Sequence, residues 1–372
     1  MDQKTDSDKT KSNAIEVPTL SLPKGGGAIK GIDEKFAVNA VNGTASFSIP
    51  LPVSPARGLS PTLSLSYNSG GGNGIFGLGW ALGLSSIKRK TDKSLPKYFD
   101  GIESDTFLFS EAEDLVPEYT KEADGSFSKD AEGRYIVKTS EDASNMYSIQ
   151  YYRPRIEGLF ARIERWRHIE TGEIKWKVTT KENITTLFGW TAQARTADPQ
   201  DIKRIFEWLP EFVFDDKGNC THYLYKKEDE SGFVATLLHN RNRKKEGSLT
   251  YTNTYLEKVL YGNKTPYGKF LDAFPNEDDY MFQTVLDYGE YAKDAPYAKV
   301  NAWDFRKDAF SQYRAGFEIR TTRLCKRALL FHHFDELPEG SALVKSLNFT
   351  YDTTSEEGFS FLTSITSYGY MK

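Results

Sequence analysis

The chain is poor in cysteine, has no long apolar run and carries no dominant charge. It contains two cysteines, Cys220 and Cys325, in 372 residues. Disulfides therefore cannot be what stabilises the fold, and buried free thiols are the expected state. No apolar run approaches about 18 residues, so we expect no transmembrane helix. The 48 basic and 52 acidic residues leave a charge of −4, too mild to indicate nucleic-acid or membrane binding.

The N-terminus lacks the apolar centre of a Sec-type signal peptide. Residues 1–13 are mostly Lys, Asp, Ser and Thr. We expect a flexible leader over residues 1–20, and release from the cell, where it occurs, by a route other than Sec. Order is expected to begin near Leu20, with a first sharp turn at Gly25–Gly27.

Helical periodicity is weak throughout, whereas aromatic residues make up 14% of the chain. Apolar residues alternate with polar ones in many short runs, which is the pattern of strands with one buried face. The runs are Phe47–Leu51, Leu63–Tyr67, Ile174–Val178, Phe212–Phe214, Tyr223–Tyr225, Leu256–Tyr261, Leu347–Tyr351 and Phe359–Phe361. We also expect a strand over Tyr280–Tyr291 and one or two helical turns over Asp304–Tyr313.

Turn signals separate these runs at intervals of roughly ten residues. Asp215–Asn219, between two aromatic runs, is typical of a hairpin turn. We therefore predict an all-β fold with little helix, built from short antiparallel strands and hairpins in a β-sandwich or an extended curled sheet. It would span residues 21–372, either as one unit or as two lobes at about 21–150 and 151–372. We detect no exact repeat, although the hairpins share one form.

The most specific segment is Tyr67–Trp80, in which six of fourteen residues are glycine. A flexible linker would have no use for Tyr67, Phe76 and Trp80. Glycines beside large rings indicate backbone held in left-handed or tightly packed conformations. We interpret the segment as a built corner of a β-structure, and we expect loss of Trp80 or Phe76 to unfold it.

Motifs for chemistry are weak. The histidines at 168, 222, 239, 332 and 333 fit no zinc spacing. For the adjacent pair His332-His333 we expect one inward and one outward ring in a structural role. Asp215–Asn219 lacks the ligand spacing of a calcium loop. Gly74 and Gly77 lie in no phosphate-binding or dinucleotide-binding motif.

Two further patterns have a functional and a structural interpretation. Glu111/Glu113 and Glu228/Glu230 match the paired glutamates of ADP-ribosyltransferases, but such pairs occur by chance in charged loops. Arg320, Arg323, Lys326 and Arg327 form a basic segment. It is interpreted first as an exposed sheet face or edge and second as a partner interface. We expect no catalytic, cofactor-binding or metal-binding residues, no cofactor and no enzymatic activity.

Taken together, motifs along the whole chain resemble the SpvB-type N-terminal domain of the B components of bacterial Tc toxins, which are RHS/YD-repeat proteins. The matching segments are Leu22–Ile29, Gly43–Ser46, Pro50–Pro55, Leu63–Trp80, Ile87–Asp92, Glu113–Pro117, Tyr261–Asn263, Tyr313–Thr321, Arg323–Cys325 and Phe331–Phe334.

The resemblance implies a secreted virulence factor whose region here forms the first part of a hollow β-sheet shell. Its implied partners are a C-type component, the RHS and propeller remainder of the B component and, through that propeller, a pore-forming A component. It implies no nucleic acid and no direct membrane insertion. The chain lacks propeller repeats and a C-component cleavage signature, so a fragment or an unusually short member is expected, secreted by a non-Sec route or cytoplasmic before release.

Three functions follow as hypotheses. The first is a non-catalytic wall module that encloses and helps to deliver a toxin polypeptide. The second is a binding module whose exposed Tyr and Trp rings dock a carbohydrate or a host surface. The third is a domain associated with an ADP-ribosyltransferase, an activity that the family carries in a separate C-terminal domain.

Overall fold

The computed structural model describes residues 35–38, 44–102, 104–110, 113–156, 158, 160–293, 298–337, 340–352 and 358–371. The expected leader over 1–20 and the expected turn at Gly25–Gly27 lie outside these residues. Within them the protein is nearly all β, as predicted. Helix is limited there to three short 3-10 turns, at Ala192–Ala194, Leu238–Asn240 and Glu277–Asp279.

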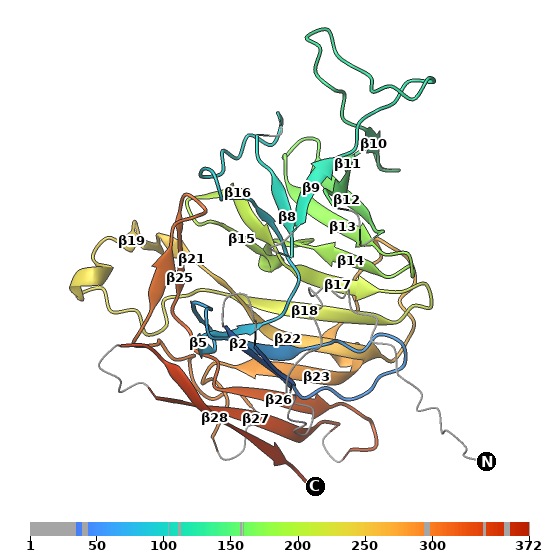
Figure 1. Ribbon diagram of the computed structural model, residues 1–372. Helices are drawn as coiled ribbons and strands as arrows, with labels where there is room; N and C mark the ends of the chain where they lie inside the picture. Colours follow the sequence, from blue (N-terminus) through green and yellow to red (C-terminus); the bar gives the residue numbers. More distant parts are fainter. Residues whose placement is uncertain are drawn as a thin grey trace.

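Seventeen strands belong to one antiparallel sheet that dominates Figure 1. Its second half is a meander in which each strand pairs with the next along the sheet. The strands are β17 (Pro210–Phe214), β18 (Cys220–Lys227), β22 (Thr254–Asn263), β23 (Tyr280–Asp287), β26 (Arg327–His332), β27 (Ala342–Asp352) and β28 (Phe361–Gly369).

The first half of the sheet curls around its own core. Its strands are β15 (Arg195–Asp198), β16 (Asp201–Trp208), β7 (Ile87–Arg89), β8 (Phe107–Phe109), β9 (Glu113–Pro117), β10 (Thr139–Glu141), β11 (Tyr147–Pro154), β12 (Arg162–His168), β13 (Ile174–Thr179) and β14 (Thr185–Phe188). The indole Nε1 of Trp208 on β16 donates to the carbonyl of Ile174 on β13 at 2.8 Å. Phe107, Trp176 and Trp208 meet edge to face inside the curl, so aromatic packing holds it closed.

A smaller antiparallel sheet of four strands covers one face of the meander. It consists of β1 (Lys35–Val38), β2 (Ala45–Pro50), β3 (Ser64–Asn68) and β6 (Trp80–Leu82). Leu63 and Leu65 from this sheet share a core with Tyr261 of β22 and Phe349 of β27. Alternation therefore places apolar side chains between two β-layers, the arrangement of a sandwich.

Short strands complete the fold. β4 (Asn73–Gly74) pairs with β5 (Gly77–Leu78), and β19 (Lys244–Lys245) pairs with β20 (Ser248–Leu249). A third small sheet holds β21 (Tyr251–Thr252), β25 (Glu318–Thr321) and β24 (Phe310–Gln312), with a parallel β21–β25 pair.

The predicted strands are confirmed, including β2, β3, β13, β22 and the hairpin of β17 and β18. The Tyr280–Tyr291 strand ends at Asp287, and Phe359 precedes the strand that begins at Phe361. The predicted helical turns over Asp304–Tyr313 are wrong. That segment runs irregularly into β24, because the Arg306 N–H bonds Thr322 O and its guanidinium bonds Gly74 O, contacts that a helix would not present together.

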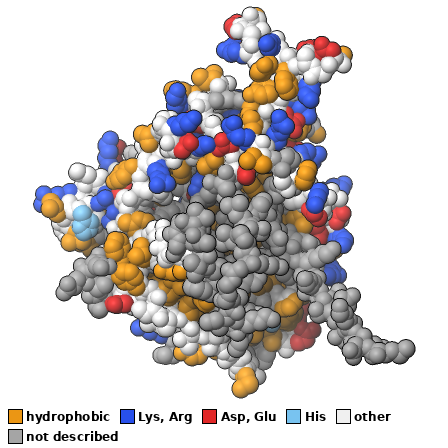
Figure 2. Space-filling view, viewed as in Figure 1, with side chains coloured by type: hydrophobic (Ala, Val, Ile, Leu, Met, Phe, Trp, Pro, Cys, Tyr) orange, Lys and Arg blue, Asp and Glu red, His pale blue; other side chains and the backbone are white. Residues whose placement is uncertain are grey.

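Residues 118–138 project from the body, between β9 and β10, and we call this segment the knob. Figure 1 shows it extending beyond the sheet beside β10. Figure 2 shows charged side chains at its tips and hydrophobic side chains toward its base.

Candidate functional site

The glycine bend, residues 67–80, connects β3 to β6 within the small sheet and packs against the meander through Phe76. Gly77 and Gly79 have φ values of +84° and +81°, a conformation that favours glycine. A Cβ at Gly77 would lie 2.4 Å from the carbonyl oxygen of Ser360, and one at Gly79 would lie 2.6 Å from the Tyr67 ring. Gly72 meets nothing within 4 Å. Two glycines are therefore required for both conformation and space, which confirms the predicted corner.

The rings of the bend differ in burial. Phe76 is fully buried and meets the Phe349 ring edge to face at 5.6 Å. Trp80 is partly exposed and packs against Tyr67 at 5.1 Å and Phe47 at 6.2 Å. Phe76 is thus the anchor of the bend, whereas Trp80 closes the small sheet.

A buried ion pair fixes the bend to two distant segments. The Arg306 guanidinium donates to Gly74 O at 2.6 Å and Asn73 Oδ1 at 3.0 Å, and it pairs with Asp308 at 2.7 Å. Asp308 also accepts from the Ser360 N–H and hydroxyl, both at 2.8 Å. Burial alone would raise the pKa of this carboxyl, but Arg306 and the other donors hold the pKa well below its ordinary value.

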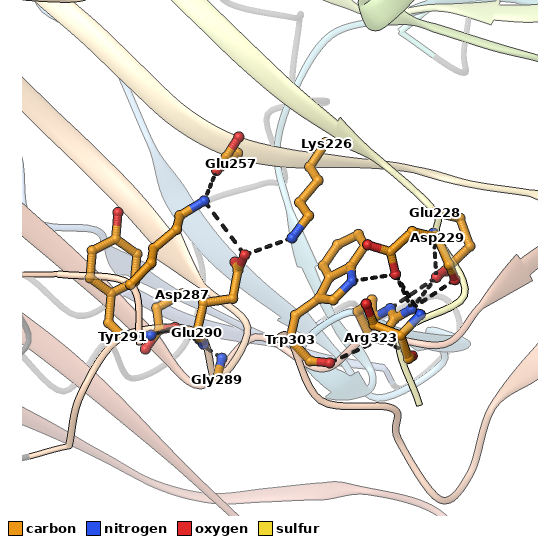
Figure 3. A network of polar contacts seen from close by, with 12 residues as sticks. Lys226, Glu228, Asp229, Glu257, Asp287, Gly289, Glu290, Tyr291, Trp303 and Arg323 are labelled. Carbon is orange, nitrogen blue, oxygen red and sulfur yellow. Dashed lines mark hydrogen bonds and ion pairs between the residues drawn. The ribbon is translucent and has the colours of Figure 1, made fainter. Parts of the chain in front are cut away.

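A second buried network ties residues 288–293 and 298–303 to the meander (Figure 3). Arg323 is fully buried and donates to Glu228 Oε1 at 2.6 and 2.9 Å, and its guanidinium carbon lies 4.2 Å from the Trp303 ring centre. The Trp303 indole donates to Asp229 at 2.7 Å. Each charge meets a counter-charge or a hydrogen-bonding partner, as burial of charge requires.

The same network continues through Glu290. Its carboxylate pairs with Lys226 at 2.6 Å and with Lys299 at 3.5 Å, and Lys299 also pairs with Glu257. Figure 3 shows Lys226 of β18 and Glu257 of β22 near Glu290, which lies in the segment after β23. The charges are used to hold loops onto the sheet.

The expectation of an exposed basic face at Arg320–Arg327 is wrong. Arg320, Arg323 and Arg327 are buried. Arg327 pairs with Asp287 at 2.6 Å, while Arg320 donates to Ser311 Oγ at 2.8 Å. The counter-charges of Arg323 and Arg327 lie far away in sequence, so the local pattern could not distinguish a buried ion-pair network from a solvated edge.

The paired glutamates are also separated by the structure. Glu228 is the buried partner of Arg323, whereas Glu230 pairs with Lys244 near the surface. Glu111 lies outside the described residues. Glu228 and Glu230 therefore do not converge on one site.

The remaining sequence candidates have structural contacts. Asp215 closes its hairpin by accepting from the N–H groups of Lys217 and Asn219, each at 2.9 Å. His332 bonds Ser54 Oγ at 2.7 Å and His333 bonds Gln283 at 2.8 Å. Both rings are half-buried, instead of one lying inward and one outward. The two cysteines, Cys220 and Cys325, are buried free thiols, as predicted.

Two lysines that the sequence did not single out, Lys175 and Lys227, have shifted pKa values. Burial lowers the pKa of Lys175 and of Lys227 to about 8 each. The Lys175 ammonium lies 3.9 Å from the Trp190 ring centre and donates to Tyr147 Oη at 2.9 Å. The sequence offered one signal for the burial of Lys175, which is its position between Ile174 and Trp176 on one strand. Neither lysine lines the cavity formed by residues 50–63 or the cavity beside Tyr98.

Two shallow cavities lie among the described residues. One of about 340 Å³ is lined by residues 50–63, including Ser54, and one of about 430 Å³ lies beside Tyr98 and Arg167. The Ser54–His332 contact borders the first. The Ser54 N–H is already donated to Tyr261 Oη at 2.8 Å, so it does not serve as an oxyanion donor.

No group of three or more His, Cys, Asp or Glu side chains that could hold a metal ion occurs in the described part of the chain. Nor does any helix among the described residues have the length and apolar character needed to cross a membrane. All six tryptophans are described, and each is buried or partly buried. Trp80 and Trp190 are the two that keep part of their surface in solvent.

The sheet and its internal ion pairs define a β-scaffold protein. Residues 39–334 match the family model SpvB, described as Salmonella virulence plasmid 65kDa B protein. The chain belongs to this SpvB family.

Relatives are known by sequence and by structure. The chain is 37% identical over 341 residues to mono(ADP-ribosyl)transferase SpvB of Salmonella typhimurium, covering 89% of this chain and 54% of that protein. It thus spans about half the length of the curated relatives it matches. The solved N-terminal domain of SpvB from Salmonella typhimurium strain LT2 superposes with a TM-score of 0.73 at 34% identity, over 87% of this chain and 98% of that domain.

Tc toxin structures also superpose. A chain of the TcdB2–TccC3 crystal structure matches with a TM-score of 0.75 at 32% identity, over 95% of this chain and 16% of that chain. A chain of the Photorhabdus luminescens Tc holotoxin pore matches with a TM-score of 0.76 at 33% identity, over 96% and 16% respectively. The fold is therefore shared by an effector and by a toxin complex.

Proposed function

We propose that this chain is a non-catalytic wall module of a Tc-type toxin B component, part of a β-shell that encloses and helps to deliver a toxin polypeptide. The observation that carries the proposal is the superposition of 96% of the chain on a Tc holotoxin chain at 33% identity. Its partners would be a C-type component, the RHS and propeller remainder of a B component and, through the propeller, an A-type pore. The shell would be released from the bacterium by a non-Sec route, after a cytoplasmic stage.

The geometry of β28 supports a wall. Among the described residues, β28 pairs with β27 along one edge and with no strand along the other. It is nine residues long, and Thr363, Thr366 and Tyr368 are exposed. An open edge of this length accepts a further antiparallel strand, so the sheet can continue into neighbouring shell.

The curated relatives are named as mono(ADP-ribosyl)transferases, so transferase activity is the alternative function to test. The chain covers 54% of those proteins, and it superposes on 98% of a solved chain that is an N-terminal domain. We place any transfer activity of the relatives outside the matched region. Labelled NAD incubated with this chain should leave no label on protein, and stable transfer would overturn the proposal.

An exchange experiment tests the wall directly. The matching region of TcdB2 is replaced by this full chain and the product is co-expressed with TccC3. We expect a particle of the size of the parent complex, with its enclosed polypeptide protected from trypsin. Gly77→Val should abolish protection, because its side chain would collide with Ser360 O, whereas Gly72→Ala should not. Failure of the unaltered chain to assemble would reject the wall function.

A further inference from the structure

The knob is built from a degenerate repeat of eight residues that sequence inspection overlooked. Residues 118–125, 126–133 and 134–141 each have an aromatic residue in second place, namely Tyr119, Phe127 and Tyr135. The first two octapeptides end in Gly125 and Gly133, which have φ values of +86° and +80°. The period is visible in the sequence, but three copies over 24 residues give a weak signal.

Backbone hydrogen bonds close the three octapeptides into a ring. Thr120 N donates to Ile136 O at 2.8 Å, Ile136 N to Ser128 O at 3.0 Å, and Ser128 N to Thr120 O at 2.9 Å. A second set of three bonds joins the fifth residue of each octapeptide to the first residue of the next, and the third octapeptide returns to the first. These bonds are Glu122 N to Ser126 O at 2.8 Å, Asp130 N to Arg134 O at 2.9 Å, and Lys138 N to Glu118 O at 2.8 Å. The knob therefore has approximate threefold symmetry and satisfies these backbone groups within itself.

The three aromatic rings form a nearly equilateral triangle. Ring centres are 5.8 Å apart for Tyr119–Phe127, 5.4 Å for Tyr119–Tyr135 and 5.5 Å for Phe127–Tyr135. Phe127 and Tyr135 nevertheless remain 41% and 51% exposed. An ordered projection that displays a ring cluster has the character of an interface anchor.

Charges on the knob are unevenly neutralised. Arg134 pairs with Asp130 at 2.8 Å and with Glu132 at 3.0 Å. Lys121 and Lys129 occupy equivalent places in the repeat and lie over the next ring, 5.7 Å from the Phe127 centre and 5.2 Å from the Tyr135 centre. Neither lysine has a carboxylate partner among the described residues. The ring cluster is thus bordered by two cations without counter-charges.

We propose that the knob is a docking element that inserts its ring cluster into an apolar groove of a protein partner, a groove bordered by carboxylates that meet Lys121 and Lys129. This rests on the proposed function, in which the partner is another part of the toxin shell. A carbohydrate fits less well, because the lysines cover ring faces that a sugar would stack on. A membrane fits less well, because acidic side chains occupy the tips (Figure 2).

Excision provides the first test. Lys138 N and Glu118 O are hydrogen-bonded, so residues 119–137 can be replaced by Asn-Gly, which favours a two-residue hairpin turn. In the isolated full chain, we expect excision to change the melting temperature by no more than a few degrees. In the exchanged TcdB2–TccC3 particle, we expect excision to shorten the lifetime of the particle roughly tenfold. An unchanged lifetime would overturn the docking role. Failure of the intact chain to assemble would instead reject the wall function.

Charge reversal separates docking from folding. Lys121→Glu with Lys129→Glu should weaken assembly roughly tenfold and reduce its sensitivity to salt, because two interfacial attractions are lost. Lys181→Glu with Lys245→Glu is the matched control, since both lysines are more than 65% exposed and lie outside the knob. Equal behaviour of the two double variants would contradict the proposal.

Photo-crosslinking identifies the occupant. A benzophenone amino acid at Tyr135 should crosslink to a protein segment that carries Asp or Glu beside apolar residues. An assembled particle without such a crosslink would overturn the docking role. So would knob-dependent flotation with phosphatidylcholine–phosphatidylglycerol vesicles, or knob-dependent binding on a glycan array, because each would assign the rings to another occupant.

Discussion

The glycine bend and the knob are made from the same residue types but use them in opposite ways. Both combine glycines in the left-handed conformation with clustered rings. In the bend, a Cβ at Gly77 would strike backbone at 2.4 Å, whereas one at Gly125 or Gly133 in the knob would meet nothing within 4 Å. Phe76 is fully buried and Phe127 is 41% exposed. The bend packs Phe76 into the core, whereas the knob leaves its rings partly exposed. This difference comes from the surroundings of each segment and not from its composition.

The largest difference is expected from truncating one ring in each region. Phe76→Ala removes a buried ring from the layer between the two sheets and should lower the free energy of unfolding by about 3–5 kcal/mol. Phe127→Ala should lower it by about 1–2 kcal/mol, because part of that ring is already in water. Urea unfolding followed by tryptophan fluorescence measures both. Equal losses of unfolding free energy in the two variants would contradict the proposed difference between the bend and the knob.

The glycines give the next largest difference. Gly77→Ala imposes left-handed strain of about 1–2 kcal/mol and a collision with Ser360 O that adds about 1–3 kcal/mol. Gly133→Ala imposes the strain alone, about 1–2 kcal/mol, because its surroundings are open. Thermal unfolding of the two variants beside Gly72→Ala distinguishes space from conformation. If Gly77→Ala and Gly133→Ala lower the melting temperature equally, the crowding around Gly77 does not contribute to the destabilisation.

Acid should weaken the bend before it affects the knob. The pKa of Asp308 lies below its ordinary value in the folded protein, so its carboxylate stabilises the fold at neutral pH. That contribution declines as the pH falls below about 4. The urea midpoint of the intact protein should therefore fall more steeply from pH 5 to 3 than that of Asp308→Asn, which starts lower because Arg306 loses its partner.

The partly exposed knob carboxylate Asp130 is the comparison for this titration. Hydrogen bonds from Arg134 lower its pKa as well, but the group is exposed to solvent and to salt. Asp130→Asn should leave the pH dependence of the urea midpoint close to that of the intact protein. A flattened profile in this variant would show that the knob contributes to acid stability.

The smallest effect is expected from a single knob lysine. Lys129→Glu removes a cation over an exposed ring, an interaction worth less than about 1 kcal/mol. The unfolding free energy should barely change, although assembly should weaken. A loss of stability comparable to that of Gly77→Ala would mean that the lysine serves folding instead of docking.

Most of the fold was predictable because strand signals are local. Alternating runs at 63–67, 174–178 and 256–261 are strands, and the Asp215–Asn219 signal is a hairpin turn. The predicted helical turns at 304–313 failed because anchoring by Arg306 and Trp303 overrides a weak local pattern. The proposed division into two lobes remains a prediction.

The candidate sites were less predictable. The buried thiols of Cys220 and Cys325 could be predicted from composition, whereas the expected absence of catalytic and metal-binding residues, which was argued from spacing, remains a prediction. The ion pairs of Arg306 and Arg323 could not be predicted. The partners of Arg306 in the bend lie 232 and 233 positions away, and Glu228 lies 95 positions from Arg323.

The sequence by itself determined the β class, the family resemblance and the position of the rigid bend, since each depends on neighbouring residues. Only the tertiary structure decided that three arginines of the basic segment are buried and that the octapeptides close into a ring. A charged side chain can be buried only where a counter-charge or hydrogen-bonding group meets it, and that meeting depends on how distant segments pack.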